Sequence, residues 1–445
     1  MTLFIDIDGT LIHHEANPEY TNSEILLKNV KQQINIWKYN GYKIILTTAR
    51  SKTNSIHQML QYHEIKYDDL ITNLPSGPRV LINDVKPSLP FTLQANSINL
   101  ERNKGFDNLT DLKHYINNDE IIKTFKGASF SKTYLIKDKY DKFKVRKIIF
   151  KNYHNKRHYN KLKLQLYNLN RFKCYYPLIT PEILHEEDND FYYYFDMEYL
   201  QNYKMLSEIT DNSNVLEKLF DILKHEVYSM KKPNKNKNWV DSFIRTRIDI
   251  NEYEKLSENI KKILNMDTLL INGIKCCGIK LLLQQSYNFF SPQFLSPIHG
   301  DLTFENILYR LDLNDIKLID MDGGDYIDAP ELDFGKLLQS DLSKYELWSC
   351  DDNVIKNIDY ENKIIDTVEY VNTEEIDKII LKYYKWKDII NPDSFFQTNQ
   401  LKKTGIFYLV LHLLRMIPYR FKHSENQAIY AIKESIYWLN YINKC

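Results

Sequence analysis

The 445-residue chain has no excess charge of either sign, few cysteines and no long apolar run. Lys plus Arg and Asp plus Glu each number 59, and this balance argues against binding to nucleic acid through bulk electrostatics. The five cysteines form no CxxC pair, which argues against a disulfide framework and a zinc ribbon and favours a reducing compartment. The first residues lack a basic region before an apolar run, so we expect no signal peptide.

The most apolar late stretch, Gly405 to Ile417, contains His412 and Arg415 and stops at Pro418. It is too short and too polar to span a bilayer, and it predicts a core helix. We therefore expect a cytoplasmic protein without a membrane span. Hydrophobic residues make up 43% of the chain, which is enough for buried cores and excludes a mainly disordered protein.

Apolar periodicity divides the chain into regions of different character. Residues 1–105 alternate strand and helix, which predicts an α/β domain with a parallel sheet. The expected strands are 3–7, 42–46, 70–72 and 80–82, and the expected helices are 23–39 and 53–63. Residues 106–122 form a polar connector in this interpretation. Hairpin strands around one helix are expected in 123–200, and 201–445 is expected to be mostly helical, apart from short strands near 307 and 318.

Two carboxylates follow the first predicted strand. Asp6 and Asp8 lie on one side of an extended chain, because side chains alternate with a period of two. Two carboxylates held together resist simultaneous ionisation unless a cation neutralises them. Hard oxygen ligands suit Mg²⁺, so the pair predicts a magnesium site.

The motif around these carboxylates resembles the haloacid dehalogenase (HAD) superfamily of phosphatases over roughly the first hundred residues. Three segments carry the resemblance: Phe4-Ile5-Asp6-Ile7-Asp8-Gly9-Thr10, Ile45-Leu46-Thr47-Thr48-Ala49-Arg50 and Leu81-Ile82-Asn83-Asp84. The resemblance implies a Rossmannoid fold in which Asp6 attacks phosphorus and Asp8 is the general acid and base. It further implies that Thr48 binds phosphate and that Asp84 completes the metal site with Asp6 and Asp8.

Two features depart from the HAD pattern. The acidic pair of its last motif is Asn83-Asp84 here, and the family's phosphate-neutralising Lys is missing, with Arg79 the nearest cation before the motif. Arg79 can carry that charge with a different, planar geometry. The segments between the motifs leave no room for a cap domain, so we expect an open site.

A second acidic motif lies late in the chain. Asp301 and Asn306 are five residues apart in Ile298–Leu308, and Asp320 follows the next predicted strand. The spacing matches a kinase catalytic loop, in which an Asp accepts the hydroxyl proton while an Asn and a second Asp bind Mg²⁺. Phosphoryl transfer needs these residue types because the charge of a triphosphate must be neutralised while the nucleophile is aimed in line.

His-Gly-Asp at residues 299–301 is similar to the aminoglycoside phosphotransferase and choline kinase group, and the resemblance runs from about residue 123 to the C-terminus. It implies a bilobal, protein-kinase-like α+β domain with an N-lobe at 123–200 and a helical C-lobe at 201–445. The implied site residues are Asp301 as catalytic base, Asn306 and Asp320 as magnesium ligands, Gly127, Ser129 and Ser131 in the phosphate-covering loop, Lys147 on the nucleotide phosphates, and Glu198 and Tyr199 in the hinge that receives adenine.

Other residues qualify this second resemblance. Arg146 is the alternative to Lys147 if the strand register shifts by one residue. Asp333 matches an Asp that braces the lobe in the family, which implies a structural role. The helix partner of the strand lysine is normally Glu, but Gln165 stands nearest that place here.

Together the two resemblances predict a bifunctional enzyme: a Mg²⁺-dependent HAD-type phosphatase fused to an ATP-dependent small-molecule kinase. The expected partners are a small-molecule hydroxyl substrate and a phosphorylated metabolite. A sugar or sugar phosphate is preferred, because 299–308 with 333–338 resembles kinase-type proteins of surface-glycan pathways. One alternative is a regulator that binds nucleotide and phosphate without turnover, which the substitutions at Gln165 and Asn83 favour. Another is a nucleic-acid end phosphatase and kinase, which the open site favours and the balanced charge opposes.

Overall fold

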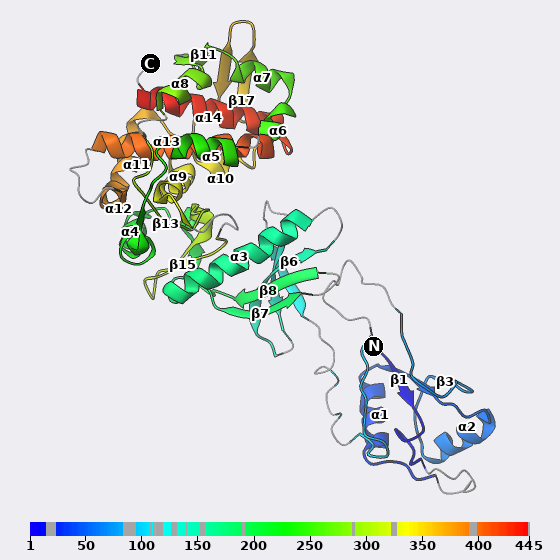
Figure 1. Cartoon of the computed structure of the whole chain (residues 1–445). Coiled ribbons are helices and arrows are strands. Elements are labelled where there is room, and N and C mark those ends of the chain that lie inside the picture. Colours follow the sequence, from blue (N-terminus) through cyan, green and yellow to red (C-terminus); the bar gives the residue numbers. More distant parts are fainter. Residues whose placement is uncertain are drawn as a thin grey trace. The chain divides into compact units, whose positions relative to one another are not determined.

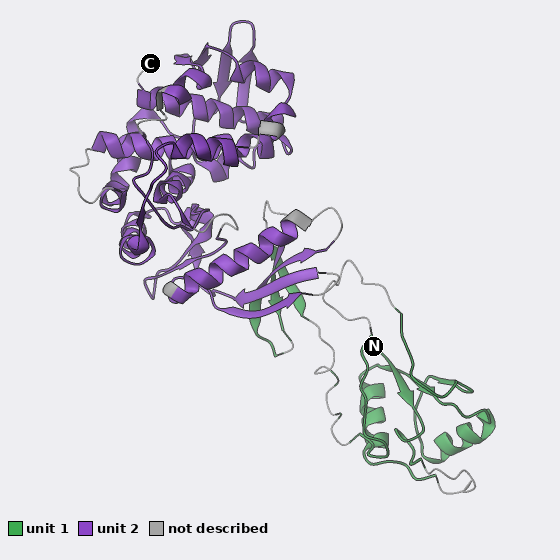
Figure 2. Ribbon diagram, in the orientation of Figure 1, with its two compact units in different colours: residues 1–125, 134–144 green, residues 126–133, 145–445 purple. Residues whose placement is uncertain are grey.

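The computed structural model describes residues 1–14, 24–82, 95–106, 109, 112, 119–125, 131–138, 140–151, 156–188, 192–248, 250–286, 290–321, 327–390 and 398–443. The chain divides into two compact units (Figure 2). Unit 1 comprises residues 1–125 and 134–144, and unit 2 comprises residues 126–133 and 145–445. Among the described residues, no helix combines the length and the apolar character needed to cross a membrane.

Unit 1 contains a three-stranded parallel sheet in the order β1-β2-β3. Its strands and helices are β1 (Thr2–Asp6), α1 (Val30–Tyr39), β2 (Lys43–Thr47), α2 (Thr53–Tyr62) and β3 (Asp69–Ile71) (Figure 1). Buried aliphatic side chains such as Ile34, Ile44 and Leu46, together with Trp37, form its core. The register places Asp6 opposite Thr47, so the carboxyl ends of β1 and β2 meet at one edge. The predicted parallel α/β arrangement is confirmed.

Two of the elements predicted in this region differ from the structure. Helix α1 begins at Val30 and not at residue 23, because Asn29 adopts a left-handed conformation with φ 62°. Leu26 instead forms a β-bridge with Ile12. The strand predicted at 80–82 is wrong: these residues form no strand and their side chains are exposed. An apolar β-branched run becomes a strand only where a neighbouring strand pairs with it.

A five-stranded sheet follows in the order β4-β5-β6-β8-β7. Its strands are β4 (Glu120–Phe125), β5 (Lys132–Lys137), β6 (Phe143–Phe150), β7 (Ile183–Asp188) and β8 (Tyr192–Glu198). Helix α3 (Lys156–Tyr175) separates β6 from β7. The hairpin strands and the helix match the prediction, whereas the sequence did not predict β4. The acidic run at residues 186–190 predicts a hairpin loop from the sequence, whereas Glu186, Glu187 and Asp188 belong to β7.

After Glu198, unit 2 is mostly helical, as predicted. Its helices are α4 (Ser213–His225), α5 (Trp239–Arg247), α6 (Ile250–Glu254), α7 (Glu258–Leu264), α8 (Ile279–Ser286), α9 (Pro330–Asp341), α10 (Tyr345–Trp348), α11 (Thr373–Lys382), α12 (Lys387–Ile390), α13 (Thr398–Phe421) and α14 (Glu425–Asn443). The predicted short strands near 307 and 318 are β14 (Ile307–Arg310) and β15 (Asp315–Leu318), which pair as an antiparallel hairpin joined on its other side by β9 (Lys204–Met205).

Unit 2 also contains strands that the sequence did not predict. The four-stranded sheet β12-β11-β18-β17 is formed by β11 (Thr268–Ile271), β12 (Ile274–Cys277), β17 (Ile355–Asp359) and β18 (Ile364–Thr367). A further small sheet has the order β10-β13-β16, from β10 (Lys232–Pro233), β13 (Phe294–Pro297) and β16 (Ile327–Asp328). These strands are two to five residues long, too short for a clear alternation of apolar side chains.

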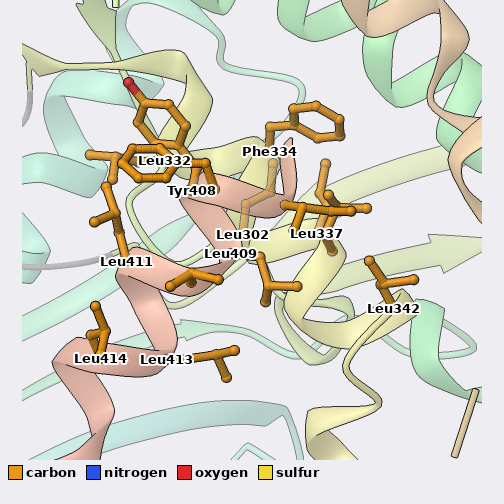
Figure 3. Close-up of a cluster of buried hydrophobic side chains, with 14 of the residues drawn as sticks. Leu302, Leu332, Phe334, Leu337, Leu342, Tyr408, Leu409, Leu411, Leu413 and Leu414 are labelled. Carbon is orange, nitrogen blue, oxygen red and sulfur yellow. The ribbon is translucent and has the colours of Figure 1, made fainter. Parts of the chain in front are cut away.

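Within the core of unit 2, α9 packs against α13. Figure 3 shows leucine and aromatic side chains of both helices meeting, with Leu302 from the loop before β14 beside them. The two helices approach closely at Gly335, where an added Cβ would lie 2.6 Å from the backbone of Tyr408. The predicted core helix is thus part of α13, although the helix continues through Pro418 instead of stopping there.

Candidate active sites

The candidate site of unit 1 lies where β1 and β2 end. Asp6 is the last residue of β1, Asp8 follows two residues later, and Thr48 is the first residue after β2. Because neighbouring parallel strands present their carboxyl ends at one edge, the three side chains come from one place in the sheet. The hydroxyl of Thr48 donates a hydrogen bond to Asp8 Oδ2 at 2.8 Å.

Arg50 is a further member of this site that the sequence did not single out. Its Nε donates to Asp8 Oδ1 at 2.8 Å, its Nη2 contacts the same oxygen, and its Nη1 pairs with Glu24. A fork of donors on one carboxylate is a strong form of ion pair. Its position in Thr47-Thr48-Ala49-Arg50, two residues after Thr48, was the available signal.

Asp6 is held more loosely. Its Oδ1 lies 3.5 Å from Arg79 Nη2, so the predicted cation does reach the predicted nucleophile. The pKa of Asp6 is raised, mainly because burial disfavours the charged form; Arg79 opposes this rise and Asp8 adds to it. Asp84, the predicted third ligand, lies outside the described residues, as does Asn83. Within the described part of the chain, no three His, Cys, Asp or Glu side chains form a group able to hold a metal ion.

In unit 2 the loop that carries Asp301 is fixed by a buried carboxylate on α9. Asp333 accepts hydrogen bonds from the backbone N–H of His299 at 2.9 Å and of Gly300 at 2.8 Å. The hydroxyl of Tyr228 donates to it at 2.9 Å. Burial raises the pKa of Asp333, and its hydrogen bonds oppose that rise. These contacts fit the bracing role that the resemblance implied for Asp333.

Both oxygens of Asp301 are engaged. Lys336 Nζ lies 3.0 Å from Oδ1, and Asn306 Nδ2 donates to the Asp301 carbonyl at 2.8 Å and to Oδ2 at 3.3 Å. The side chain of Asp301 is still 42% exposed, so a ligand can reach it. The sequence did not assign a role to Lys336, although it lies one helical turn after Asp333.

Asn306 and Asp320 lie at one end of the β14–β15 hairpin. Ile307 pairs with Leu318, and the N–H of Ile319 donates to the carbonyl of Asn306 at 3.0 Å. Asp320 adopts a left-handed backbone with φ 56°, a conformation that is costly for a non-glycine residue and concentrates at functional sites. A carboxylate and an amide oxygen at this point fit the hard-oxygen ligand set of Mg²⁺.

The structure distinguishes Lys147 from Arg146, the two candidates for the lysine position on the strand. Lys147 Nζ donates to Asp320 Oδ1 at 2.7 Å, whereas Arg146 forms two hydrogen bonds with buried Asp196 at 2.7 and 2.8 Å. The two side chains leave opposite faces of β6, as the alternation of a strand requires. The geometry therefore places Lys147, and not the alternative Arg146, beside the candidate metal ligand.

The other predicted nucleotide-binding residues lie around the five-stranded sheet. Ser131 immediately precedes β5, whereas Gly127 and Ser129 lie outside the described residues. Glu198 ends β8, and its N–H donates to the carbonyl of Glu182 at 2.9 Å. The carbonyl of Tyr199 accepts from the N–H of Gln201 at 2.9 Å. These two hinge groups are therefore already used within the protein.

Solved structures similar to this chain include small-molecule kinases. A protein assigned as a fructosamine-3-kinase from Haemophilus somnus is 13% identical, with 74% of this chain and 93% of that chain covered and a TM-score of 0.43. An aminoglycoside phosphotransferase from Streptomyces rimosus is 12% identical, with 66% and 92% covered and a TM-score of 0.36. At such identities and scores the likeness assigns no function to this chain.

The sequence comparisons concern the N-terminal part. No curated protein matches the chain. Residues 3–74 match a family model described as haloacid dehalogenase-like hydrolase, and this span contains Asp6, Asp8, Thr48 and Arg50. The predicted resemblance of the N-terminal part is confirmed: residues 3–74 are similar to haloacid dehalogenase-like hydrolases.

Proposed function

We propose that the chain is a bifunctional phosphoryl-transfer enzyme. Unit 1 removes phosphate from a phosphorylated metabolite, and unit 2 moves the γ-phosphoryl group of ATP to an alcohol. One observation carries the kinase proposal: a connected set of contacts links Lys147 to Asp320, the β14–β15 hairpin end to Asn306, and Asn306 to Asp301. These residue types are the ones that phosphoryl transfer needs.

In the proposed kinase site, each side chain has one task. Asp301 accepts the proton of the acceptor hydroxyl as its oxygen bonds to the γ-phosphorus and the bond to ADP breaks. Asn306 and Asp320 would hold Mg²⁺, which when bound neutralises charge on the triphosphate. Lys147 then binds the nucleotide phosphates. Ser131 with Gly127 and Ser129 covers them. The backbone at Glu198 and Tyr199 receives the base in place of the internal hydrogen bonds that it makes without nucleotide.

In the proposed phosphatase site, a carboxylate oxygen of Asp6 bonds to phosphorus while the alcohol leaves with a proton from Asp8. Water then opens the resulting acyl phosphate, with Asp8 taking its proton. Thr48 and Arg79 bind the phosphate oxygens. Asp6 and Asp8, with Asp84, would hold Mg²⁺, which when bound offsets the charge of two neighbouring carboxylates.

The surroundings of Asp301 favour a polar acceptor, and we propose a sugar or sugar phosphate. Glu305 interacts electrostatically with Glu346, Asp301 and Arg420. The exposed Glu305 and the 42% exposed Asp301 offer carboxylate acceptors of the kind that the hydroxyl donors of a sugar require.

A screen for ADP release tests the kinase half. Purified protein, Mg²⁺ and ATP are incubated with a library of alcohols that includes sugars and sugar phosphates, beside an Asp301→Asn control. We expect at least one alcohol to release ADP in the wild type, with a loss of about 10²- to 10⁴-fold in the control. ADP release that is equal in both proteins would contradict the assignment of Asp301.

Hydrolysis of p-nitrophenyl phosphate tests the phosphatase half. We expect Mg²⁺-dependent hydrolysis that disappears in Asp6→Asn and is unchanged in Asp301→Asn. The reverse pattern, or hydrolysis that survives Asp6→Asn, would show that unit 1 is not the phosphatase.

A second candidate function is a regulator that binds nucleotide and phosphate without turnover. The observation that favours it is the engagement of Asp8 by both Arg50 and Thr48, which occupies a group that should be available for proton transfer. This candidate predicts thermal stabilisation by ATP without ADP release and without hydrolysis of p-nitrophenyl phosphate. Turnover at either site would exclude it.

A further inference from the structure

One face of α9 contacts the loop that carries Asp301 at three successive points. Asp333, Lys336 and Ser340 are spaced three and four residues apart, so their side chains lie on the same side of the helix. Asp333 accepts from the N–H groups of His299 and Gly300. Ser340 Oγ accepts from the N–H of Phe304 at 3.0 Å. Between them, Lys336 contacts a side chain, the carboxylate of Asp301.

The other face of α9 anchors the helix. Phe334 and Leu337 point into the cluster shared with α13 (Figure 3). Gly335 lies so close to the backbone of Tyr408 that no side chain would fit between the helices. Close-packed helices of this kind do not shift freely, so the packing of α9 against α13 fixes the backbone position of Lys336.

The two side chains that meet in the Lys336–Asp301 ion pair differ in how far they are buried. The Lys336 side chain is only 11% exposed, whereas Asp301 is 42% exposed. A buried ammonium group must be paired, and Asp301 is the carboxylate that pairs with it. Because Asn306 donates to the other oxygen, the plane of the Asp301 carboxylate is held from two sides. Each of its oxygens keeps a lone pair that can accept a proton.

We propose that Lys336 is a positioning residue for phosphoryl transfer: from α9 it holds Asp301 Oδ1, so that the carboxylate meets the acceptor hydroxyl in a productive orientation. This inference rests on the kinase function proposed above. Lys336 acts on the acceptor side, through Asp301, whereas Lys147 contacts the candidate metal ligand Asp320. Its loss should therefore lower kcat and leave nucleotide binding unchanged.

Steady-state kinetics of Lys336→Met test the inference. We expect kcat to fall about 10²-fold, the scale of a misplaced reacting group, with the KM for ATP within twofold of wild type. Lys336→Arg keeps the charge and should recover most of the loss. A kcat for Lys336→Met within twofold of wild type, or no recovery in Lys336→Arg, would overturn the proposal.

A double-mutant cycle shows whether Lys336 acts through Asp301. If it does, Lys336→Met combined with Asp301→Asn should be no slower than Asp301→Asn alone, because the group that Lys336 positions is already gone. Losses that multiply would overturn the proposal, since Lys336 would then act independently of Asp301.

Lys344→Met is the matched control. Lys344 lies just beyond the end of α9 and pairs with Asp341 at 3.3 Å, and Asp341 keeps a second partner in Lys382 at 2.7 Å. The control therefore removes a lysine of the same region without leaving a buried carboxylate unpaired. We expect its kcat to stay within twofold of wild type, and a loss as large as that of Lys336→Met would overturn the specific role of Lys336.

Hydrogen exchange followed by mass spectrometry tests the inference without any substrate. In Lys336→Met, backbone amides of residues 301–306 should exchange at least several-fold faster than in Lys344→Met. If the wild type phosphorylates no alcohol, the proposed function fails and the exchange result alone decides on Lys336. Equal exchange in the two variants would then overturn the positioning role.

Discussion

The two candidate sites obtain their cations in different ways. In unit 1, Arg50 lies two residues after Thr48, so the same loop supplies both the hydroxyl and the guanidinium that hold Asp8. In unit 2, Lys147 comes from β6 and Lys336 from α9, two elements that belong neither to the loop of Asp301 nor to the β14–β15 hairpin beside Asp320. A site built within one βαβ unit can have its cationic side chain in the same short sequence motif as its phosphate-binding residue. A site built from several elements obtains it only through tertiary packing.

The ion pairs of the two units also differ in burial. We expect the largest loss of stability when Arg146 is replaced. Arg146 and Asp196 are 4% and 0% exposed, whereas Arg50 and Asp8 are 31% and 18% exposed. Arg146→Met removes both hydrogen bonds that Arg146 donates to the buried carboxylate of Asp196, and it should lower the free energy of unfolding of unit 2 by about 3–5 kcal/mol. Urea unfolding followed by tryptophan fluorescence measures this. Arg146→Met with Asp196→Leu should recover most of the loss, and a single variant within about 1 kcal/mol of wild type would contradict the prediction.

The neighbouring lysine should behave in the opposite way. Lys147→Met removes the cation that we propose binds the nucleotide phosphates, and it should lower kcat of the proposed kinase by about 10²-fold or more. Its effect on unfolding should stay below about 1 kcal/mol, because its partner Asp320 is 41% exposed and can be hydrated. Kinetics and urea unfolding of the same preparation separate the two effects. A variant that is fully active but unstable would show that Lys147 is structural, like Arg146.

Glu331 on α9 contrasts with the carboxylates of these ion pairs. It is buried, and one of its oxygens has no hydrogen-bond partner. Burial raises its pKa to about 8, from an ordinary value of 4.5. Between these values the folded protein keeps a proton that the unfolded chain has released, so stability falls as pH rises. The slope is at most about 1.4 kcal/mol per pH unit. Glu331→Gln should flatten the dependence of Tm on pH between 5 and 8. A wild-type Tm that rises over this range, with an equal rise in the variant, would contradict the prediction.

Arg50→Met should have the smallest effect on stability. The Arg50 pairs are partly exposed, so its loss should lower the local stability of unit 1 by no more than about 1 kcal/mol. Hydrogen exchange in α2, compared with Lys52→Met as a nearby exposed lysine, measures this change. An effect as large as that of Arg146→Met would remove the distinction between the two sites.

Much of the acidic part of both sites could be predicted from the sequence, because it follows local rules. Asp6 ends one strand and Thr48 directly follows its parallel neighbour, and Asn306 and Asp320 flank one hairpin. In each case a short segment with clear strand periodicity fixes where the side chain lies. The order β1-α1-β2-α2-β3 in unit 1 followed from the same periodicity.

Two of the cations, Arg50 and Lys336, could not be predicted in the same way, and Lys147 and Arg79 were expected only through the family resemblances. Lys336 reaches Asp301 only because α9 is packed against α13 at Gly335, a contact between residues far apart in the chain. The same limit explains the errors in secondary structure. Residues 80–82 have strand-forming side chains without a strand partner, and β11 and β18 pair in parallel although they lie far apart in the sequence. Pairing of this kind leaves no local pattern.

A crystal structure with Mg²⁺ and ADP tests the central claim most directly. The account predicts a metal ion bound by Asn306 and Asp320, nucleotide phosphates on Lys147, and Asp301 still held by Lys336 with its free face toward the phosphates. Nucleotide bound elsewhere, or a metal ion that contacts neither Asn306 nor Asp320, would contradict it.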